Sequence, residues 1–183
     1  MSNETGSYAD FAIRFKNLET GVDYEDEISS ATGFAWANDN KTYFYAMPDN
    51  QTLRPNRIYR AQLGGATPHT LVYEEANELF NLYVEKSRSG RYIYLSSSSF
   101  TSTEYRLIDP QQPAREPKLF MPRKSDVRYT LDDHEKFFVL RYRDQETTNY
   151  KVVKVPLEKS SDRNLWTDVF SLEPNSTVED TVV

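Results

Sequence analysis

The 183-residue sequence contains no cysteine, which excludes disulfide bonds and thiolate metal sites. No apolar stretch approaches the roughly 20 residues that a membrane-spanning helix needs. The basic residues are scattered and form no stripe, so nucleic acid is not expected as a partner. The start of the chain lacks the basic-then-apolar pattern of a signal peptide. Together these absences favour a cytoplasmic location, with the periplasm left open, and no membrane partner.

Glycine and histidine are also scarce, with six and two residues. None of the glycines belongs to the Gly-x-Ser-x-Gly turn that carries the nucleophile of an α/β-hydrolase. Aromatic residues, in contrast, are abundant: 13 Tyr, 10 Phe and 2 Trp. Such residues favour strands, and helical periodicity is hard to find, so the sequence predicts an all-β fold. The net charge of −6 is mild and mainly favours solubility.

Three stretches of the chain are similar, and each has a turn signal followed by an apolar strand. The strands begin at Tyr43, Tyr92 and Phe137, at spacings of 49 and 45 residues. A repeat of this length is typical of a β-propeller with one four-stranded blade per repeat. The expected first strands of the three repeats are 34–37, 82–85 and 127–130, and the second strands are 43–46, 92–95 and 137–140. The third strands are 57–60, 104–107 and 149–153, and the fourth strands are 70–73, 118–121 and 167–170.

The segment before the first repeat fits the same pattern, because Ile13 precedes Ile58 by 45 residues. We therefore expect a partial propeller of about three and a half antiparallel four-stranded blades. Residues 1–30 would form a half blade of outer strands, whose first residues need not be native, and 31–79, 80–125 and 126–173 would form blades, followed by a polar tail at 174–183. Two open blade faces would remain, through which the chain could self-associate.

Few residues suggest chemistry. His134 lies beside Asp132, Asp133 and Glu135, but the repeat places it at a hairpin tip, and His69 falls in a polar connection. Two histidines so far apart form no recognisable metal-ligand set.

Serine-rich and acidic segments have equally plain interpretations. Residues 87–90 are expected to form a hairpin turn, and 96–99 with 101–103 a polar loop, although that loop could bind phosphate. The acidic pairs at 74–75 and 132–133 are expected to be hydrated, and the recurring Tyr and Phe to pack in the core. We assign no catalytic, cofactor-binding or metal-binding residue.

Several short phrases, in their order and spacing, resemble the N-terminal propeller of the oligopeptidase B branch of the prolyl oligopeptidase family of serine peptidases. The resemblance extends from Phe11 to Phe170, and its phrases are residues 15–21, 36–40, 52–55, 71–75, 101–106 and 120–123.

This resemblance implies a seven-bladed parent propeller joined to an α/β-hydrolase domain with a Ser/Asp/His triad. It also implies cleavage of short basic peptides after Lys or Arg, with the propeller limiting substrate size. No residue of this chain matches a triad motif, so the chain alone is expected to be inactive and to have the hydrolase domain as its partner. Arg54 and Arg123 are candidate contacts to that domain.

Two alternatives stay open. The chain could be a non-enzymatic propeller module that binds a protein or peptide, or an aromatic-rich carbohydrate binder. A reading frame that continues into a Gly-x-Ser-x-Gly domain would favour the peptidase interpretation.

Overall fold

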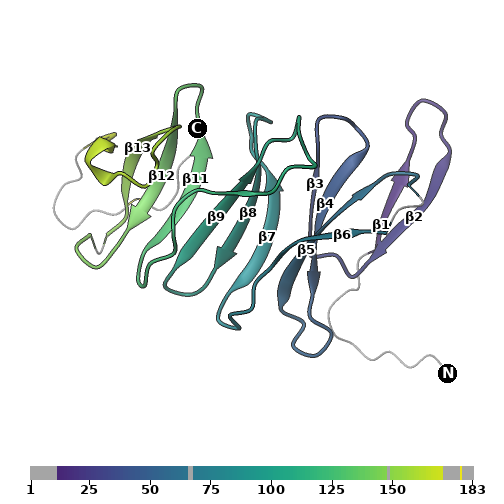
Figure 1. Ribbon diagram of the computed structural model, residues 1–183, viewed down its shortest axis with the longest axis horizontal. Coiled ribbons are helices and arrows are strands. Elements are labelled where there is room, and N and C mark those ends of the chain that lie inside the picture. Colours follow the sequence, from purple (N-terminus) through teal and green to yellow (C-terminus); the bar gives the residue numbers. More distant parts are fainter. Residues whose placement is uncertain (1–11, 66–67, 148, 171–177, 179–183) are drawn as a thin grey trace.

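The computed structural model describes residues 12–65, 68–147, 149–170 and 178, and in this part of the chain strands predominate (Figure 1). One 3-10 turn, η1 (Arg163–Leu165), is the exception among the described elements. The predicted all-β fold is confirmed. No helix in the described residues is long and apolar enough to cross a membrane.

The strands form one two-stranded and three four-stranded sheets, and neighbouring strands are antiparallel throughout. In each four-stranded sheet the strand order follows the chain. The half blade contains β1 (Ala12–Lys16) and β2 (Asp23–Ser29). Blade 1 contains β3 (Gly33–Trp36), β4 (Thr42–Pro48), β5 (Pro55–Gln62) and β6 (Thr70–Glu74). Blade 2 contains β7 (Asn81–Lys86), β8 (Ile93–Ser98), β9 (Thr103–Ile108) and β10 (Lys118–Leu119). Blade 3 contains β11 (Arg128–Asp133), β12 (Phe137–Arg143), β13 (Lys151–Pro156) and β14 (Thr167–Asp168).

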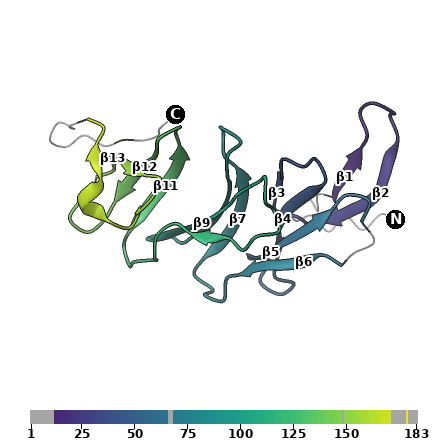
Figure 2. The same ribbon diagram turned by 45° about the horizontal axis from the view of Figure 1, so that its top comes forward.

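The four sheets stand side by side as a row that does not close into a ring (Figures 1 and 2). This arrangement confirms the prediction of a partial propeller. Of the expected polar tail at 174–183, only Val178 is described; its carbonyl accepts a hydrogen bond from Arg141 Nη1 at 3.1 Å.

Three hydrophobic clusters of described residues lie between successive sheets, because the second strand of each blade is largely buried on both faces. Thr42–Ala46 of β4 and Ile93–Ser97 of β8 are buried throughout. The blades therefore pack face to face through the clusters formed mainly by Phe15, Ile28, Tyr43 and Tyr45; by Phe44, Ile58, Leu82, Val84 and Leu95; and by Tyr94, Tyr105, Tyr129, Phe138 and Leu140.

Two expected boundaries were wrong. Ser96–Ser98 belong to β8 rather than to a loop, and Ser97 is buried. Residues 132–133 were expected in a turn, but β11 continues through Asp133. Both segments are polar in sequence, yet Ser97 donates a hydrogen bond to Glu75 of the connection between blades 1 and 2, and Asp133 accepts one from Ser89 of blade 2. These hydrogen bonds compensate for the burial of the two side chains in a strand.

The connections between strands alternate between two ends of the row. One end of the row carries the hairpins at 49–54 and 99–102 and the connections between blades at 75–80 and 120–127; we call it the lower end, as it is oriented in Figure 1. The upper end carries the hairpins at 37–41, 87–92 and 134–136. The chain enters the first strand and leaves the last strand of each complete blade at the lower end.

Candidate interaction surface

Three large apolar side chains project from the lower end. The side chains belong to Leu53, Leu79 and Phe100, and these residues are 64%, 76% and 88% exposed. They come from three different segments: the β4–β5 hairpin, the connection from β6 to β7, and the β8–β9 hairpin. Apolar residues this exposed, on neighbouring loops, are typical of a surface that binds a partner.

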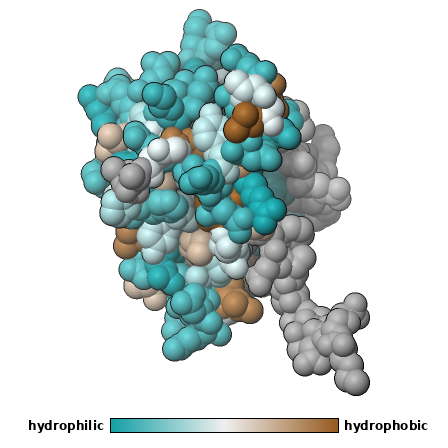
Figure 3. Space-filling view, turned by 90° about the vertical axis from the view of Figure 1, so that its right-hand side faces the viewer, coloured by the Kyte–Doolittle hydropathy of each residue, from teal (hydrophilic) through white to brown (hydrophobic). Residues whose placement is uncertain are grey.

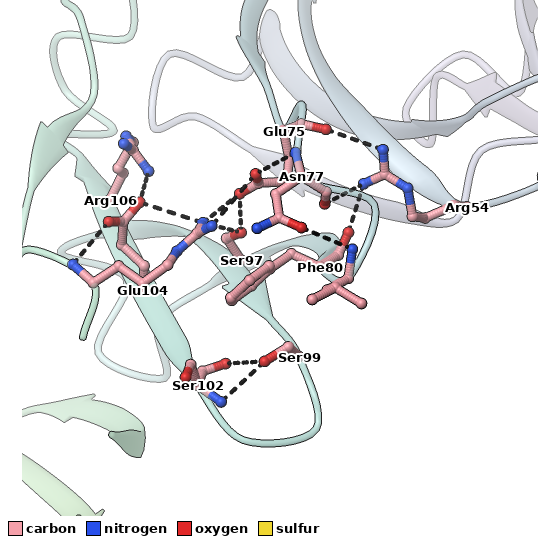
Figure 4. A network of polar contacts seen from close by, with 11 residues as sticks. Arg54, Glu75, Asn77, Phe80, Ser97, Ser99, Ser102, Glu104 and Arg106 are labelled. Carbon is pink, nitrogen blue, oxygen red and sulfur yellow. Dashed lines mark hydrogen bonds and ion pairs between the residues drawn. The ribbon is translucent and has the colours of Figure 1, made fainter. Parts of the chain in front are cut away.

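The loops that present these side chains are held by local hydrogen bonds. The carboxylate of Asp49 accepts from the backbone N–H groups of Gln51 and Thr52, both at 2.9 Å, and Leu53 adopts a left-handed φ of 57°. In the second hairpin, the N–H of Ser102 donates to Ser99 Oγ at 3.0 Å (Figure 4). These side-chain-capped turns fix the direction in which each loop points.

The connection at 75–80 is fastened to the first hairpin by Arg54. Its guanidinium donates to the backbone carbonyls of Glu75 (3.1 Å), Asn77 (3.3 Å) and Phe80 (2.6 Å), as Figure 4 shows. Asn77 also accepts a hydrogen bond from the N–H of Leu79 at 3.0 Å. Leu53 and Leu79 are thus carried by segments that Arg54 joins directly.

A buried ion pair joins the two connections of the lower end. The carboxylate of Glu75 is paired with Arg123 and accepts a hydrogen bond from the hydroxyl of Ser97. The Arg123 guanidinium also donates to Ser97 Oγ at 2.8 Å and lies over the ring of Phe80, 3.6 Å from its centroid. Hydrogen bonds and the aromatic ring therefore compensate much of the cost of burying the two charges, although Arg123 Nε has no hydrogen-bond partner among the described residues.

Glu104 of β9 extends this network toward the middle of blade 2. Its carboxylate pairs with Arg106, accepts from the backbone N–H of Arg123 at 3.1 Å, and lies 3.7 Å from the guanidinium of the same residue. Figure 4 shows these groups from β8, β9 and the connections meeting in one row. The loops that expose apolar side chains are therefore supported from within.

The ionisation of Glu75 and Arg123 reflects this pairing. Burial opposes the charged form of Glu75, but hydrogen bonds from Arg123 and Ser97 outweigh it and lower the pKa of the carboxyl. Burial likewise opposes the charge of Arg123, but the hydrogen bond to Glu75 raises its pKa. Both shifts favour the charged pair.

A second buried carboxylate lies at the upper end. Asp133 accepts from Ser89 Oγ (2.6 Å), Arg91 Nε (2.8 Å) and Tyr94 Oη (2.9 Å), so it ties blade 3 to blade 2. Burial works against its ionisation, but the hydrogen bonds from Ser89, Tyr94 and Arg91 win and lower its pKa.

The structure places the other candidate residues as follows. Residues 87–90 form the expected turn, closed by the N–H of Gly90 to the carbonyl of Ser87 at 2.9 Å. His134 stacks on Phe137 in the expected hairpin. His69 is exposed and contacts the hydroxyl of Tyr45. No group of three or more possible metal ligands occurs in the part of the chain that the structure describes.

One expectation about this surface was wrong. The acidic pairs at 74–75 and 132–133 were expected to be hydrated, but Glu75 and Asp133 are buried because arginines of neighbouring segments reach them. The guanidinium groups of Arg54 and Arg123 bind within the chain, and their contact to another domain stays a prediction. Leu53, Leu79 and Phe100 were missed, although an apolar residue inside a turn signal is a usable clue.

Comparison with known proteins identifies a matching protein family. Residues 3–182 match the model of the prolyl oligopeptidase N-terminal β-propeller domain. The chain is 34% identical over 172 residues to dipeptidyl aminopeptidase BI of Pseudoxanthomonas mexicana, a match that covers 91% of the chain and 23% of the relative. It is 27% identical over 157 residues to protease 2 of Moraxella lacunata, with 84% and 22% covered.

Solved structures show the same arrangement of sheets. Oligopeptidase B from Leishmania major superimposes with a TM-score of 0.79 at 25% identity, covering 87% of the chain and 23% of that protein. Oligopeptidase B from Trypanosoma brucei, solved in a closed form with covalently bound antipain, gives a TM-score of 0.79 at 21% identity and covers 93% and 24%. The chain thus spans about a quarter of the length of these relatives.

Proposed function

The chain belongs to the family of prolyl oligopeptidase N-terminal β-propeller domains, and we propose that it restricts the size of substrates that reach a peptidase domain of the same protein. Four sheets of a propeller form a wall rather than a reactive site. Such a wall, placed over a peptidase domain, admits short peptides and keeps folded proteins and bulk water out.

The observation that supports this proposal is the group of three exposed apolar side chains at the lower end, where the blades also begin and end. Every complete blade begins and ends there, so a domain that follows or precedes a whole number of blades in the chain would be attached at this end. Leu53, Leu79 and Phe100 project from the same end and are highly exposed. We propose that the peptidase domain packs on these three side chains.

The chemistry would come from that domain. We propose a serine peptidase with a Ser/Asp/His triad on an α/β-hydrolase fold, which cleaves short peptides after Lys or Arg. The resemblance of residues 15–21, 36–40 and 101–106 to the oligopeptidase B branch supports this specificity. No residue of this chain is given a catalytic role.

One observation favours a second candidate activity. The relative with 34% identity carries the name dipeptidyl aminopeptidase BI. The whole protein could therefore remove dipeptides from free N-termini instead of cleaving within peptides. A blocked arginyl substrate and a dipeptidyl substrate with a free amino group separate the two activities.

The size-restricting role predicts a loss of selectivity in the variant Leu79→Asp/Phe100→Asp of the full-length protein. Burying two carboxylates against the partner domain costs several kcal/mol, so the domains should separate more easily. We expect the ratio of cleavage rates for a long polypeptide and a short blocked arginyl peptide to rise about tenfold or more. Competition between the two substrates, followed by mass spectrometry, measures this ratio.

The matched control is Leu71→Asp, which changes a half-exposed leucine on the outer strand β6. This control should leave the ratio unchanged. An unchanged ratio in the double variant, with normal folding, would show that the lower end does not face the peptidase domain.

A further inference from the structure

A pocket lies at the upper end, between the outer strands of blade 1 and a connection that belongs to blade 2. This connection, residues 109–117 between β9 and β10, lies against blade 1 and is called the strap below. The N–H of Asn38 donates to the carbonyl of Pro110, and Arg60 Nη1 donates to the carbonyl of Pro113, both at 2.9 Å. The pocket between the strap and blade 1 has a volume of about 310 Å³, which suits a small ligand.

Two opposite charges, Arg60 and Asp39, line this pocket. Neither forms an ion pair with the other or with any other charged group of the described residues. Arg60 is partly buried, and within the described part of the chain its guanidinium donates to the Pro113 carbonyl alone. The carboxylate of Asp39 accepts hydrogen bonds from the N–H groups of Lys41 and Thr42 and from Thr42 Oγ1. Burial opposes its charge, but the hydrogen bonds from Thr42 lower the pKa of the carboxyl, so Asp39 is ionised at neutral pH.

The register of blade 1 separates the two charges along the pocket. Arg60 of β5 lies opposite Phe44 of β4, which packs in the cluster between blades 1 and 2, so both side chains are on the face toward blade 2. Gln62 lies opposite Thr42, to which Asp39 is hydrogen-bonded. The two-residue step from Arg60 to Gln62 corresponds to about 7 Å along the strand. An extended dipeptide spans about the same length.

Opposite charges on the half blade, in contrast, pair with each other. Arg14 of β1 and Glu27 of β2 form an ion pair of 2.7 Å, and Figure 3 shows that this end of the molecule is largely hydrophilic. Charges that neutralise one another in water gain little from a ligand. Arg60 and Asp39 differ because each keeps an uncompensated charge at the wall of the same pocket.

We propose that this pocket binds a dipeptide with free amino and carboxyl ends. The guanidinium of Arg60 would bind the carboxylate of the ligand. The carboxylate of Asp39 accepts three hydrogen bonds of about four possible, so it would accept one more from the ammonium group. Pro113 and Ala114 would contact small apolar side chains of the ligand. A bound dipeptide would thus join the strap to β5 and hold blades 1 and 2 together at the upper end, whatever domain lies at the lower end.

Amide hydrogen exchange of the full-length protein tests this proposal, with alanyl-leucine as the probe. At about 10 mM probe, and for a dissociation constant of about 1 mM, exchange across residues 111–116 of the strap should slow about tenfold by mass action. The lower-end hairpin at 49–54 is the reference and should be unchanged. N-acetyl-alanyl-leucine and alanyl-leucinamide each lack one of the two charges and should slow the exchange less than twofold.

Arg60→Gln should remove the effect of alanyl-leucine, whereas the matched control Arg57→Gln, on the same strand but outside the pocket, should retain it. Unchanged exchange of the strap with alanyl-leucine would overturn the proposal. Equal slowing by the acetylated or amidated peptide would also overturn it, because the pocket would then not recognise both charges. An undiminished effect in folded Arg60→Gln would do the same. If that variant does not fold, the comparison of the three ligands on the parent protein decides.

Discussion

Replacing Glu75 with alanine is expected to lower the free energy of unfolding of this chain by about 3–5 kcal/mol, the usual cost of breaking a buried ion pair. The side chains of Glu75 and Arg123 are 6% and 24% exposed. Removal of the carboxylate leaves the guanidinium facing Ser97 and the ring of Phe80 with no counter-charge except the more distant Glu104. Urea denaturation followed by circular dichroism measures the change.

The matched control is Glu27→Ala, which removes an acid from the exposed Arg14–Glu27 pair. Exposed ion pairs contribute about 0–1 kcal/mol, so this variant should be nearly as stable as the parent. Adding Arg123→Ala to Glu75→Ala should recover part of the loss. Equally small losses of stability in Glu75→Ala and Glu27→Ala would mean that the Glu75–Arg123 pair does not join the two connections of the lower end.

Replacing Phe44 with alanine is expected to cost about 3–5 kcal/mol, as is usual for a buried phenylalanine. Phe44 is fully buried between blades 1 and 2. Phe100→Ala removes the same group from a side chain that is 88% exposed. The second variant should therefore lie within about 0.5 kcal/mol of the parent. Thermal unfolding of both variants and the parent provides the comparison.

The two phenylalanine variants distinguish a side chain that is needed for folding from one that is available to bind a partner. A large loss of stability in Phe100→Ala would show that this ring packs within the chain, which would remove it from the proposed interaction surface. A small loss in Phe44→Ala would show that blades 1 and 2 do not form the tight pair seen here.

The sequence predicted the sheets well because their signals are local. Turn residues such as Asp39 and Gly90 precede runs of apolar residues, and repetition of the same order makes each weak signal stronger. Asp39 accepts the backbone N–H groups of Lys41 and Thr42, and Gly90 has a φ of 74°, so both residues have the role that their type suggested. The half blade followed from spacing alone.

The buried polar groups could not be predicted in this way. Glu75 and Arg123 are 48 residues apart, and Asp133 and Arg91 are 42 apart, so their pairing depends on how neighbouring blades pack. A carboxylate in a loop is usually hydrated. Only the three-dimensional arrangement shows that an arginine and hydroxyl groups from another blade make burial possible.

The role of the exposed apolar residues, unlike that of the turn residues, is not indicated by local sequence signals. Phe100 stands within a polar segment, where one apolar residue gives no periodic signal, and Leu79 directly precedes the buried Phe80, so the sequence does not show which of these two is exposed. Their importance follows from the end of the row to which the topology brings them, together with Leu53. The sequence could indicate a propeller fragment and its family resemblance, but the side on which a partner would lie required the structure.

The most direct test of the proposed interaction surface is amide hydrogen exchange at the two ends of the blades, measured in this chain and in the full-length protein. We predict slower exchange in the full-length protein for the lower-end segments 49–54, 75–80 and 99–102, with little change for the upper-end hairpins 37–41 and 87–92. Slower exchange at the upper hairpins, with the lower segments unchanged, would place the partner domain on the other end and contradict the account.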